Sequence, residues 1–378
     1  MLRDAFSLGR LYAIMAKEFV QLRRDRLTFA MMIGIPVIQM TLFGFAINGD
    51  PRSLPTAVVA HEQGPFTRSL VRALENTGYF RVVDATLGEA EAERALAQGD
   101  VQFVLTVPAG FARALQRGEH PALLLEADAT DPAATGNAIG AVQQLAARAL
   151  RHDLVGPLAA PDAPPPFEWR IQRRYNPEGI TQYNVVPGLM GVILTMTMIM
   201  MTGLAVTREV ERGTMENLLA TPVRPLEVMV GKIVPYIVIG LVQVAIILLA
   251  AKFVFSVPFA GSIALLMLGV LAFIAASLTV GITISSVARS QMQAMQMTFF
   301  FFLPSLLLSG FMFPFRGMPG WAQWLGQVLP LTHFLRYIRG VMLKGNAAAE
   351  LWPHLWPLLL FTAVVLAVGL RRFRRTLD

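Results

Sequence analysis

Long apolar runs separated by short polar segments dominate the pattern of this chain. Each run is long enough to cross the roughly 30 Å hydrocarbon core of a bilayer as a helix. The pattern predicts an α-helical polytopic membrane protein with six transmembrane helices. The predicted spans are residues 27–47, 183–206, 233–255, 259–288, 291–315 and 354–370.

The composition agrees with this prediction and excludes several other classes. The chain is 54% hydrophobic and only 15% charged, whereas about a quarter of the residues in a soluble domain are charged. The net charge of +7 fits basic residues that flank membrane spans. No basic stripe with interleaved aromatic residues indicates a nucleic-acid partner. The absence of Cys excludes disulfide bonds and thiolate chemistry.

The distribution of Lys and Arg predicts the orientation, because the cytoplasmic flanks of spans are enriched in them. Six basic residues lie within residues 1–26, and four lie in the tail 371–378. Both termini are therefore expected in the cytoplasm, which six crossings satisfy. The apolar residues of 1–26 recur at helical spacing and predict an interfacial helix on the inner leaflet, with a soluble helix docked on a partner as the alternative.

Residues 48–182 are then expected outside, where strand-like and helix-like patterns alternate. This alternation predicts an inserted α/β extracytoplasmic domain. The expected strands are 54–60, 80–84, 101–108 and 121–128, and the expected helices are 65–78, 88–100, 109–119 and 132–154. The Pro-rich residues 156–169 are predicted to be a linker or an extended arm. The domain has neither a Gly-rich phosphate loop nor a plausible metal cluster.

A second outer segment, residues 316–353, is amphipathic and is not predicted to cross the membrane. It contains Arg336, Arg339 and Lys344, which weakly violate the charge rule for an outer segment. The two strongly basic ends of the chain outweigh this violation.

The predicted cytoplasmic loop, residues 207–232, is more charged than a simple connection requires. Its stretch TREVERGTMENLLATPVRP carries six charged residues, whereas residues 183–206 carry none. The preceding helix is predicted to continue through Arg208 and Glu211. Gly213 then permits a sharp turn.

After this turn Thr214 is a suitable N-cap for a short helix with Glu216 in its first turn. The helix presents Met215, Leu218 and Leu219 on one side. Such a helix is either a docking knob for a cytoplasmic partner or a turn that lies in the lipid interface. These residues alone leave both interpretations open.

The stretch EVERGTMENLLATPVRPLEVMVGKIVPY resembles the cytoplasmic loop of ABC-2 type permeases, the membrane subunits of bacterial ATP-binding-cassette exporters. The resemblance extends to RRYNPEGITQYNVVPGLMG, LPSLLLSGFMFPFRGMP and LPLTHFLRYIRGVMLKG, and it places an ABC-2 type transmembrane domain at approximately 145–375. The large outer insertion is similar to that of permeases for drugs and small amphiphiles. The resemblance also implies outer re-entrant helices within 316–353.

The resemblance implies that the loop helix couples to a separate ATPase subunit. It also implies that this chain lies in the inner membrane of a bacterial cell. The expected docking contacts are Glu211, Arg212, Gly213, Thr214, Met215, Glu216, Leu218 and Leu219. Further expected partners are a second permease copy, identical or a sibling, the lipid bilayer, and an outer-envelope adaptor; no nucleic acid is expected. The chain itself is not expected to be an enzyme or to hold a cofactor, because it lacks a G-x-x-x-x-G-K-[ST] motif and ATP would bind to the partner.

The six runs contain no Asp or Glu, which disfavours a carrier driven by protons or sodium ions. Their apolar surface favours hydrophobic or amphiphilic substrates, such as drug-like molecules or lipids. The candidate substrate path comprises Met196, Met200, Phe299, Phe302 and Phe311, with ordinary apolar packing as the alternative. Two other functions are considered: export of a lipid-linked glycan or other polymer, and a non-transporting sensor, which would need a larger output segment than the tail of eight residues.

Overall fold

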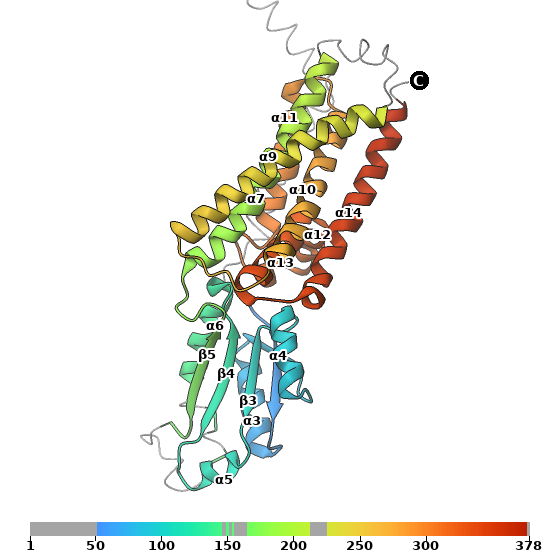
Figure 1. Cartoon of the computed structure of the whole chain (residues 1–378). Coiled ribbons are helices and arrows are strands. Elements are labelled where there is room, and N and C mark those ends of the chain that lie inside the picture. Colours follow the sequence, from blue (N-terminus) through green and yellow to red (C-terminus); the bar gives the residue numbers. More distant parts are fainter. Residues whose placement is uncertain (1–50, 146–148, 151–152, 155–164, 212–224, 376–378) are drawn as a thin grey trace, which may run out of the picture.

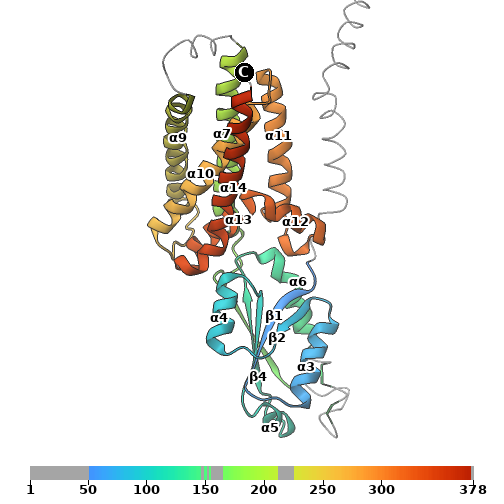
Figure 2. The same ribbon diagram turned by 90° about the vertical axis from the view of Figure 1, so that its right-hand side faces the viewer.

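The computed structural model describes residues 51–145, 149–150, 153–154, 165–211 and 225–375. Figure 1 shows an elongated molecule in which a small α/β unit lies at one end of a bundle of long helices. The view turned by 90° shows the same two parts, with the sheet below and the helices above (Figure 2). The predicted interfacial helix 1–26 and the predicted span 27–47 lie outside the described residues.

The α/β unit alternates strands with helices, as its sequence pattern predicts. Its strands pair in the order β2-β1-β3-β4-β5, and only the β3–β4 pair is antiparallel. The strands are β1 (Leu54–Ala60), β2 (Phe80–Asp84), β3 (Phe103–Val107), β4 (Ala122–Asp128) and β5 (Glu168–Arg174). The helices are α3 (Pro65–Asn76), α4 (Glu89–Gln98), α5 (Phe111–Gln116) and α6 (Pro132–Leu145).

The sheet buries both faces, because helices cover each of them. Side chains of β3 alternate between two cores, as the period of two along a strand requires. Phe103 and Leu105 join the core beneath α3 and α6, whereas Val104 joins the core beneath α4. Leu96 at the end of α4 is fully buried and fixes that end against the sheet.

The prediction that residues 156–169 form only a linker or arm is wrong at its end. Glu168 and Trp169 begin β5, which pairs with β4 in parallel from Ala122 to Asp128. In β5, Trp169 and Ile171 pack against the core, whereas Arg170 between them is exposed. An edge strand with one polar face carries few apolar residues. In EWRIQRR the many charged residues therefore make the alternation of apolar and polar positions hard to recognise.

The helical part contains four helices that are long and apolar enough to cross a membrane, judged by length and composition in the described residues. Their apolar segments are Thr181–Leu204, Pro235–Phe253, Ile263–Ser285 and Ala348–Gly369. These segments belong to α7 (Thr181–Glu211), α9 (Pro225–Phe253), α10 (Ile263–Ser285) and α14 (Ala348–Arg375). The other elements are α11 (Gln291–Leu308), η3 (Phe315–Gly317), α12 (Gly320–Val328), α13 (Pro330–Arg339) and a π-helical turn, η4 (Gly340–Lys344).

The limits of the helices differ from those of the predicted spans, and two of the differences concern the helices that flank the outer segment 316–353. Helix α11 ends at Leu308, short of the predicted end at residue 315, and it is not among the four candidate spans. Gly310 follows with φ +84°, a left-handed conformation that ends the helix direction. Helix α14 begins at Ala348, so the segment predicted as 316–353 loses its last residues to this helix.

Helix α10 is the central element of the bundle and packs between α7 and α14. The short helix α13 packs against all three. The ring of Phe334 stacks on Phe273 of α10 at 4.1 Å between centroids. Tyr337 donates a hydrogen bond of 2.6 Å to the carbonyl oxygen of Leu265, and its ring lies where a Cβ at Gly269 would be. Glycine at position 269 is therefore required for this close approach.

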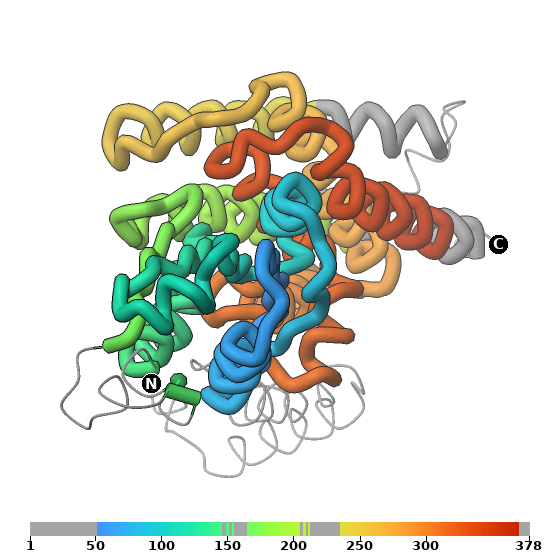
Figure 3. Tube along the Cα trace, turned by 90° about the horizontal axis from the view of Figure 1, so that it is seen from below, coloured from blue at the N-terminus to red at the C-terminus, as the bar shows by residue number. Residues whose placement is uncertain are grey.

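The outer helices leave apolar side chains uncovered. In the apolar segments of α9 and α14 only 17% of the residues are buried, compared with 61% in α10. The exposed side chains of α9 include Val238, Val242 and Ile246, and those of α14 include Trp356 and Leu360. Exposed apolar surface of this extent is typical of a protein that contacts lipid or another subunit. Seen from below in Figure 3, α9 and α14 lie on the outer side of the bundle.

Candidate functional site

The described part of the predicted coupling loop is the end of helix α7. The prediction that the helix continues through Arg208 and Glu211 is confirmed. Oε2 of Glu211 accepts hydrogen bonds from the backbone N (3.3 Å) and from Nε2 (2.8 Å) of Gln291, the first residue of α11. A carboxylate at a helix N-terminus satisfies free N–H groups and interacts favourably with the helix dipole. The loop therefore starts from a point that is bonded to α11.

The remaining predicted docking residues lie outside the described residues. They are Arg212, Gly213, Thr214, Met215, Glu216, Leu218 and Leu219. Their role as a coupling helix stays a prediction.

The candidate substrate path is distributed over α7, α11 and the segment after α11. Met196 and Met200 of α7 and Phe302 of α11 are half-buried, whereas Phe299 is 46% exposed. Phe311 packs on the main helical core, with its ring where a Cβ at Gly188 would be. Other methionines of α7, Met190 and Met198, are fully buried filler in this core.

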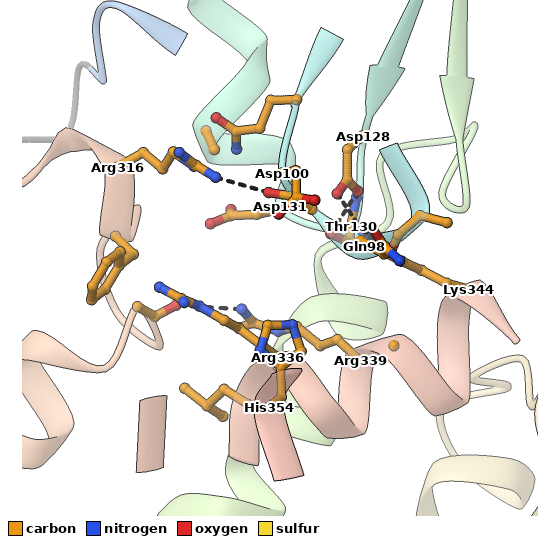
Figure 4. A pocket seen from close by; sticks show the side chains of 18 of the residues that line it. Gln98, Asp100, Asp128, Thr130, Asp131, Arg316, Arg336, Arg339, Lys344 and His354 are labelled. Atoms are coloured by element: carbon orange, nitrogen blue, oxygen red, sulfur yellow. Dashed lines mark hydrogen bonds and ion pairs between the residues drawn. The ribbon is translucent and has the colours of Figure 1, made fainter. Parts of the chain in front are cut away.

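A polar cavity of about 210 Å³ lies where the α/β unit meets the helical part. None of the five candidate path residues lines it. Figure 4 shows acidic side chains of the α/β unit on one side of the cavity and basic side chains of the helical part on the other. The acidic residues are Asp100, Asp128 and Asp131, and the basic ones are Arg316, Arg336, Arg339 and Lys344.

The C-terminus of α4 is held by side chains from the helical part. Lys344 donates from Nζ to the carbonyl oxygens of Leu96 (3.2 Å) and Ala97 (3.3 Å), and Asn346 donates from Nδ2 to Ala97 O (3.0 Å). Arg316 donates from Nη2 to Gly99 O at 2.8 Å. The last carbonyls of a helix lack partners within it and carry partial negative charge, which favours cations there. These donors therefore form a cap for α4 that comes from the other part of the molecule.

Lys344 also forms a buried ion pair with Asp128. Its Nζ lies 2.6 Å from Oδ2, and the side chains of the two residues are only 8% and 9% exposed. The other oxygen of Asp128 accepts from N and Oγ1 of Thr130, at 3.1 and 2.8 Å. All three donors of the ammonium group and both carboxylate oxygens are thus used, as a buried pair requires.

Asp131 at the start of α6 connects the α/β unit to α7. Its Oδ1 accepts from the backbone N of Ala133 and from Nδ2 of Asn184, both at 3.2 Å. Burial raises the pKa of Asp131 above its usual range, and the nearby positive charge of Arg339 opposes that shift only in part. The carboxyl group is thus less acidic than a solvent-exposed aspartate.

Arg336 and Arg339 of α13 lie side by side on the floor of the cavity (Figure 4). Burial, followed by the positive charges of Arg316 and Arg339, lowers the pKa of Arg336 to about 10. The group remains charged at neutral pH, as arginine does in proteins generally. The guanidinium of Arg336 stacks 4.4 Å from the ring centroid of Phe315. Burial also lowers the pKa of Arg339, whose Nη1 donates a long hydrogen bond of 3.4 Å to Gly310 O.

Comparison with known proteins identifies the family to which this chain belongs. The profile of the ABC-2 family transporter proteins matches residues 26–371, which is nearly the whole chain. The chain belongs to the ABC-2 transporter family. The helical, multi-pass architecture with four described apolar segments agrees with a membrane protein of this kind.

Several relatives match this ABC-2 chain over almost their full length. The probable multidrug ABC transporter permease YbhR of Escherichia coli is 29% identical over 97% of this chain and 98% of its own length. The inner membrane transport permease YhhJ of Escherichia coli is 29% identical over 100% of this chain and 98% of its own length. The linearmycin resistance permease protein LnrN of Bacillus subtilis is 20% identical over 97% of this chain and 100% of its own length. The ABC-2 chain is therefore similar to transport permeases.

The polar cavity of the ABC-2 chain is the feature that sequence reasoning missed. The signal was present, since Arg336, Arg339 and Lys344 violate the charge rule in a segment predicted to lie outside. A basic cluster in an unexpected place indicates an acidic partner or ligand. Asp128 is the partner of Lys344, but 216 residues separate the two, and no local pattern connects them.

Proposed function

We propose that this chain is the permease subunit of an exporter that moves hydrophobic or amphiphilic compounds and is powered by a separate ATPase subunit. Full-length similarity to permeases, two of them named for multidrug transport or linearmycin resistance, carries the proposal. In this proposal six spans cross the membrane, with 27–47 and α11 added to the four described apolar segments. Both termini then lie in the cytoplasm of a bacterial cell, and the α/β unit lies outside the inner membrane.

The uncovered apolar faces of α9 and α14 support a location in the bilayer. Two-fold assemblies are the commonest oligomers, and a second permease copy would complete the pathway. Aromatic and methionine side chains exposed or half-buried on α7 and α11, such as Met200 and Phe299, suit contact with varied apolar molecules.

In the proposal, energy enters through the loop that follows Glu211. The hydrogen bonds between Glu211 and Gln291 support this route, because they join the start of the loop to helix α11. A movement of the loop by the ATPase would then be transmitted to α7 and α11 together.

Co-purification tests the energy route. The permease and its proposed ATPase subunit are expressed together, and the ATPase is quantified after capture of the permease. Leu218→Asp places a charge in the proposed apolar contact and is expected to release the ATPase, whereas Leu218→Met keeps the contact apolar and is expected to retain it. Equal recovery of the ATPase with both variants would contradict docking through this helix.

A further inference from the structure

The cavity between the α/β unit and α13 contains basic side chains that its acidic side chains do not all neutralise. Lys344 and Asp128 neutralise each other at 2.6 Å. Arg316 is bonded to Gly99 O and is attracted by Asp100, and Arg339 is attracted by Asp131. The charges that act on Arg336 within the described residues are those of Arg316 and Arg339, which repel it.

Two nitrogens of the neighbouring Arg339 are also unused. Its Nε and Nη2 are buried and have no hydrogen-bond partner among the described residues. A buried donor without a partner costs about 1–3 kcal/mol, and more when the group is charged. Two adjacent guanidinium groups, one of them with two unpaired donors and neither in an ion pair within the described part of the chain, therefore indicate that a negatively charged partner completes the site.

The acidic residues of the cavity are engaged with other groups, and Asp100 attracts Arg316. Asp128 is fully used by Lys344 and Thr130, and Asp131 accepts from Ala133 and Asn184. Because Asp128 is already paired with a cation, the cavity does not suit a metal cation. The side of the cavity that lacks partners of opposite charge is the one formed by the arginines.

The size and walls of the cavity indicate the class of ligand. A volume of about 210 Å³ holds several water molecules or a tetrahedral oxyanion. The planar fork of arginine matches phosphate and carboxylate groups through paired hydrogen bonds. Phe315 and Leu335 line the same cavity and offer apolar contact to whatever carries the anion.

We propose that this cavity binds an oxyanion group, a phosphate or a carboxylate, with Arg336 and Arg339 as its principal ligands and Arg316 at its edge. The group belongs either to a free anion or to the head of an anionic amphiphile, which share this chemistry. The inference goes beyond the proposed function and does not depend on it, because binding is measured on the permease without the ATPase.

The test uses the full chain in phosphatidylcholine nanodiscs and chloride-free buffer, with binding followed by isothermal titration. The probes are inorganic phosphate, short-chain phosphatidic acid and short-chain phosphatidylcholine, which is neutral overall. Saturable binding of phosphate supports recognition of the anion itself, and binding of phosphatidic acid alone supports a site for an amphiphile's head group. Binding of neither, or equal binding of phosphatidylcholine, would overturn the proposal.

Variants assign the binding to the cavity. Arg336→Gln is expected to weaken anion binding at least tenfold. Arg336→Lys keeps the charge but loses the planar guanidinium, and its affinity is expected to lie between those of the wild type and Arg336→Gln. Arg336→Gln removes a repelled charge and is expected to fold, which its thermal transition verifies. The matched control is Arg113→Gln, an exposed site on α5 at the far end of the α/β unit, with an expected change of less than twofold (Figure 1). Wild-type affinity in Arg336→Gln would also overturn the proposal.

Discussion

Replacing Lys344 by Met tests how strongly the α/β unit is held to the helices. Met preserves most of the volume of the stem but removes the ammonium group that binds Asp128 at 2.6 Å and two carbonyls of α4. Removing one partner of a buried ion pair costs about 3–5 kcal/mol, because the other charge stays buried without compensation. Side-chain exposures of 8% and 9% place this pair in that class. The free energy for opening the contact is expected to fall by this amount.

Amide hydrogen exchange of the full chain in nanodiscs measures this opening locally. Amides at the end of α4 and in η4 are expected to exchange roughly 10²- to 4 × 10³-fold faster in Lys344→Met, since about 1.4 kcal/mol corresponds to tenfold. The double variant with Asp128→Asn is expected to recover part of the loss, because no unpaired charge remains.

The matched control is Arg117→Ala. It removes an ion pair of 3.6 Å whose side chains are 64% and 55% exposed, and such pairs contribute about 0–1 kcal/mol. Exchange in Lys344→Met that is no faster than in this control would refute the expected contribution of the ion pair to holding the α/β unit.

Three further predictions concern α11, the cavity and the core. Glu211→Gln is expected to lower stability by at most about 1 kcal/mol in chemical denaturation and to speed exchange at the start of α11; unchanged exchange there would remove its role at Gln291. Asp131→Asn is expected to unfold at or above the wild-type temperature at pH 7, because the raised pKa of Asp131 makes its ionisation destabilising as pH rises. That advantage is expected to vanish below about pH 3, where the group is protonated in both states, and a lower midpoint at pH 7 would contradict it. Gly269→Ala is expected to cost about 1–3 kcal/mol through overlap with the ring it faces, whereas Gly140→Ala, with open space at its Cβ, is expected to be neutral or stabilising; equal unfolding midpoints would contradict the close packing.

Much of the α/β unit is readable from sequence, because its strands are buried and its helices end at clear signals. β1 and β2 have the predicted limits, and Gly99 ends α4 with φ +81° as the Gly at that position indicates. β5 was missed because its single apolar face alternates with charged residues. The local period of two was present, but the neighbouring Pro-rich stretch suggested extended chain without pairing.

The apolar spans are predictable for a different reason: length and hydropathy decide them without tertiary information. The exceptions are helix ends, which depend on local contacts. Helix α11 stops at Leu308, where Gly310 takes a left-handed conformation and Phe315 lies against it. Hydropathy does not report such contacts, since Phe311 and Phe313 are as apolar as the residues of the helix.

The polar cavity depends on contacts between distant segments and could not be derived from sequence. Arg336 and Arg339 at a spacing of three share a face of α13, which the pattern shows. That this face meets the acidic edge of the sheet is a property of the fold alone. The predicted coupling helix is the converse case, since its motif is specific in sequence while residues 212–224 lie outside the described ones.

ATP-driven transport in proteoliposomes tests the central proposal most directly. The permease and its ATPase subunit are reconstituted together, and accumulation of a hydrophobic fluorescent compound is followed in inside-out vesicles after ATP is added outside. Accumulation is expected only when both subunits and ATP are present, and Leu218→Asp is expected to abolish it while leaving the permease inserted. Accumulation by the permease without the ATPase, or no accumulation of any hydrophobic or amphiphilic compound by an intact, ATP-hydrolysing complex, would contradict the proposal.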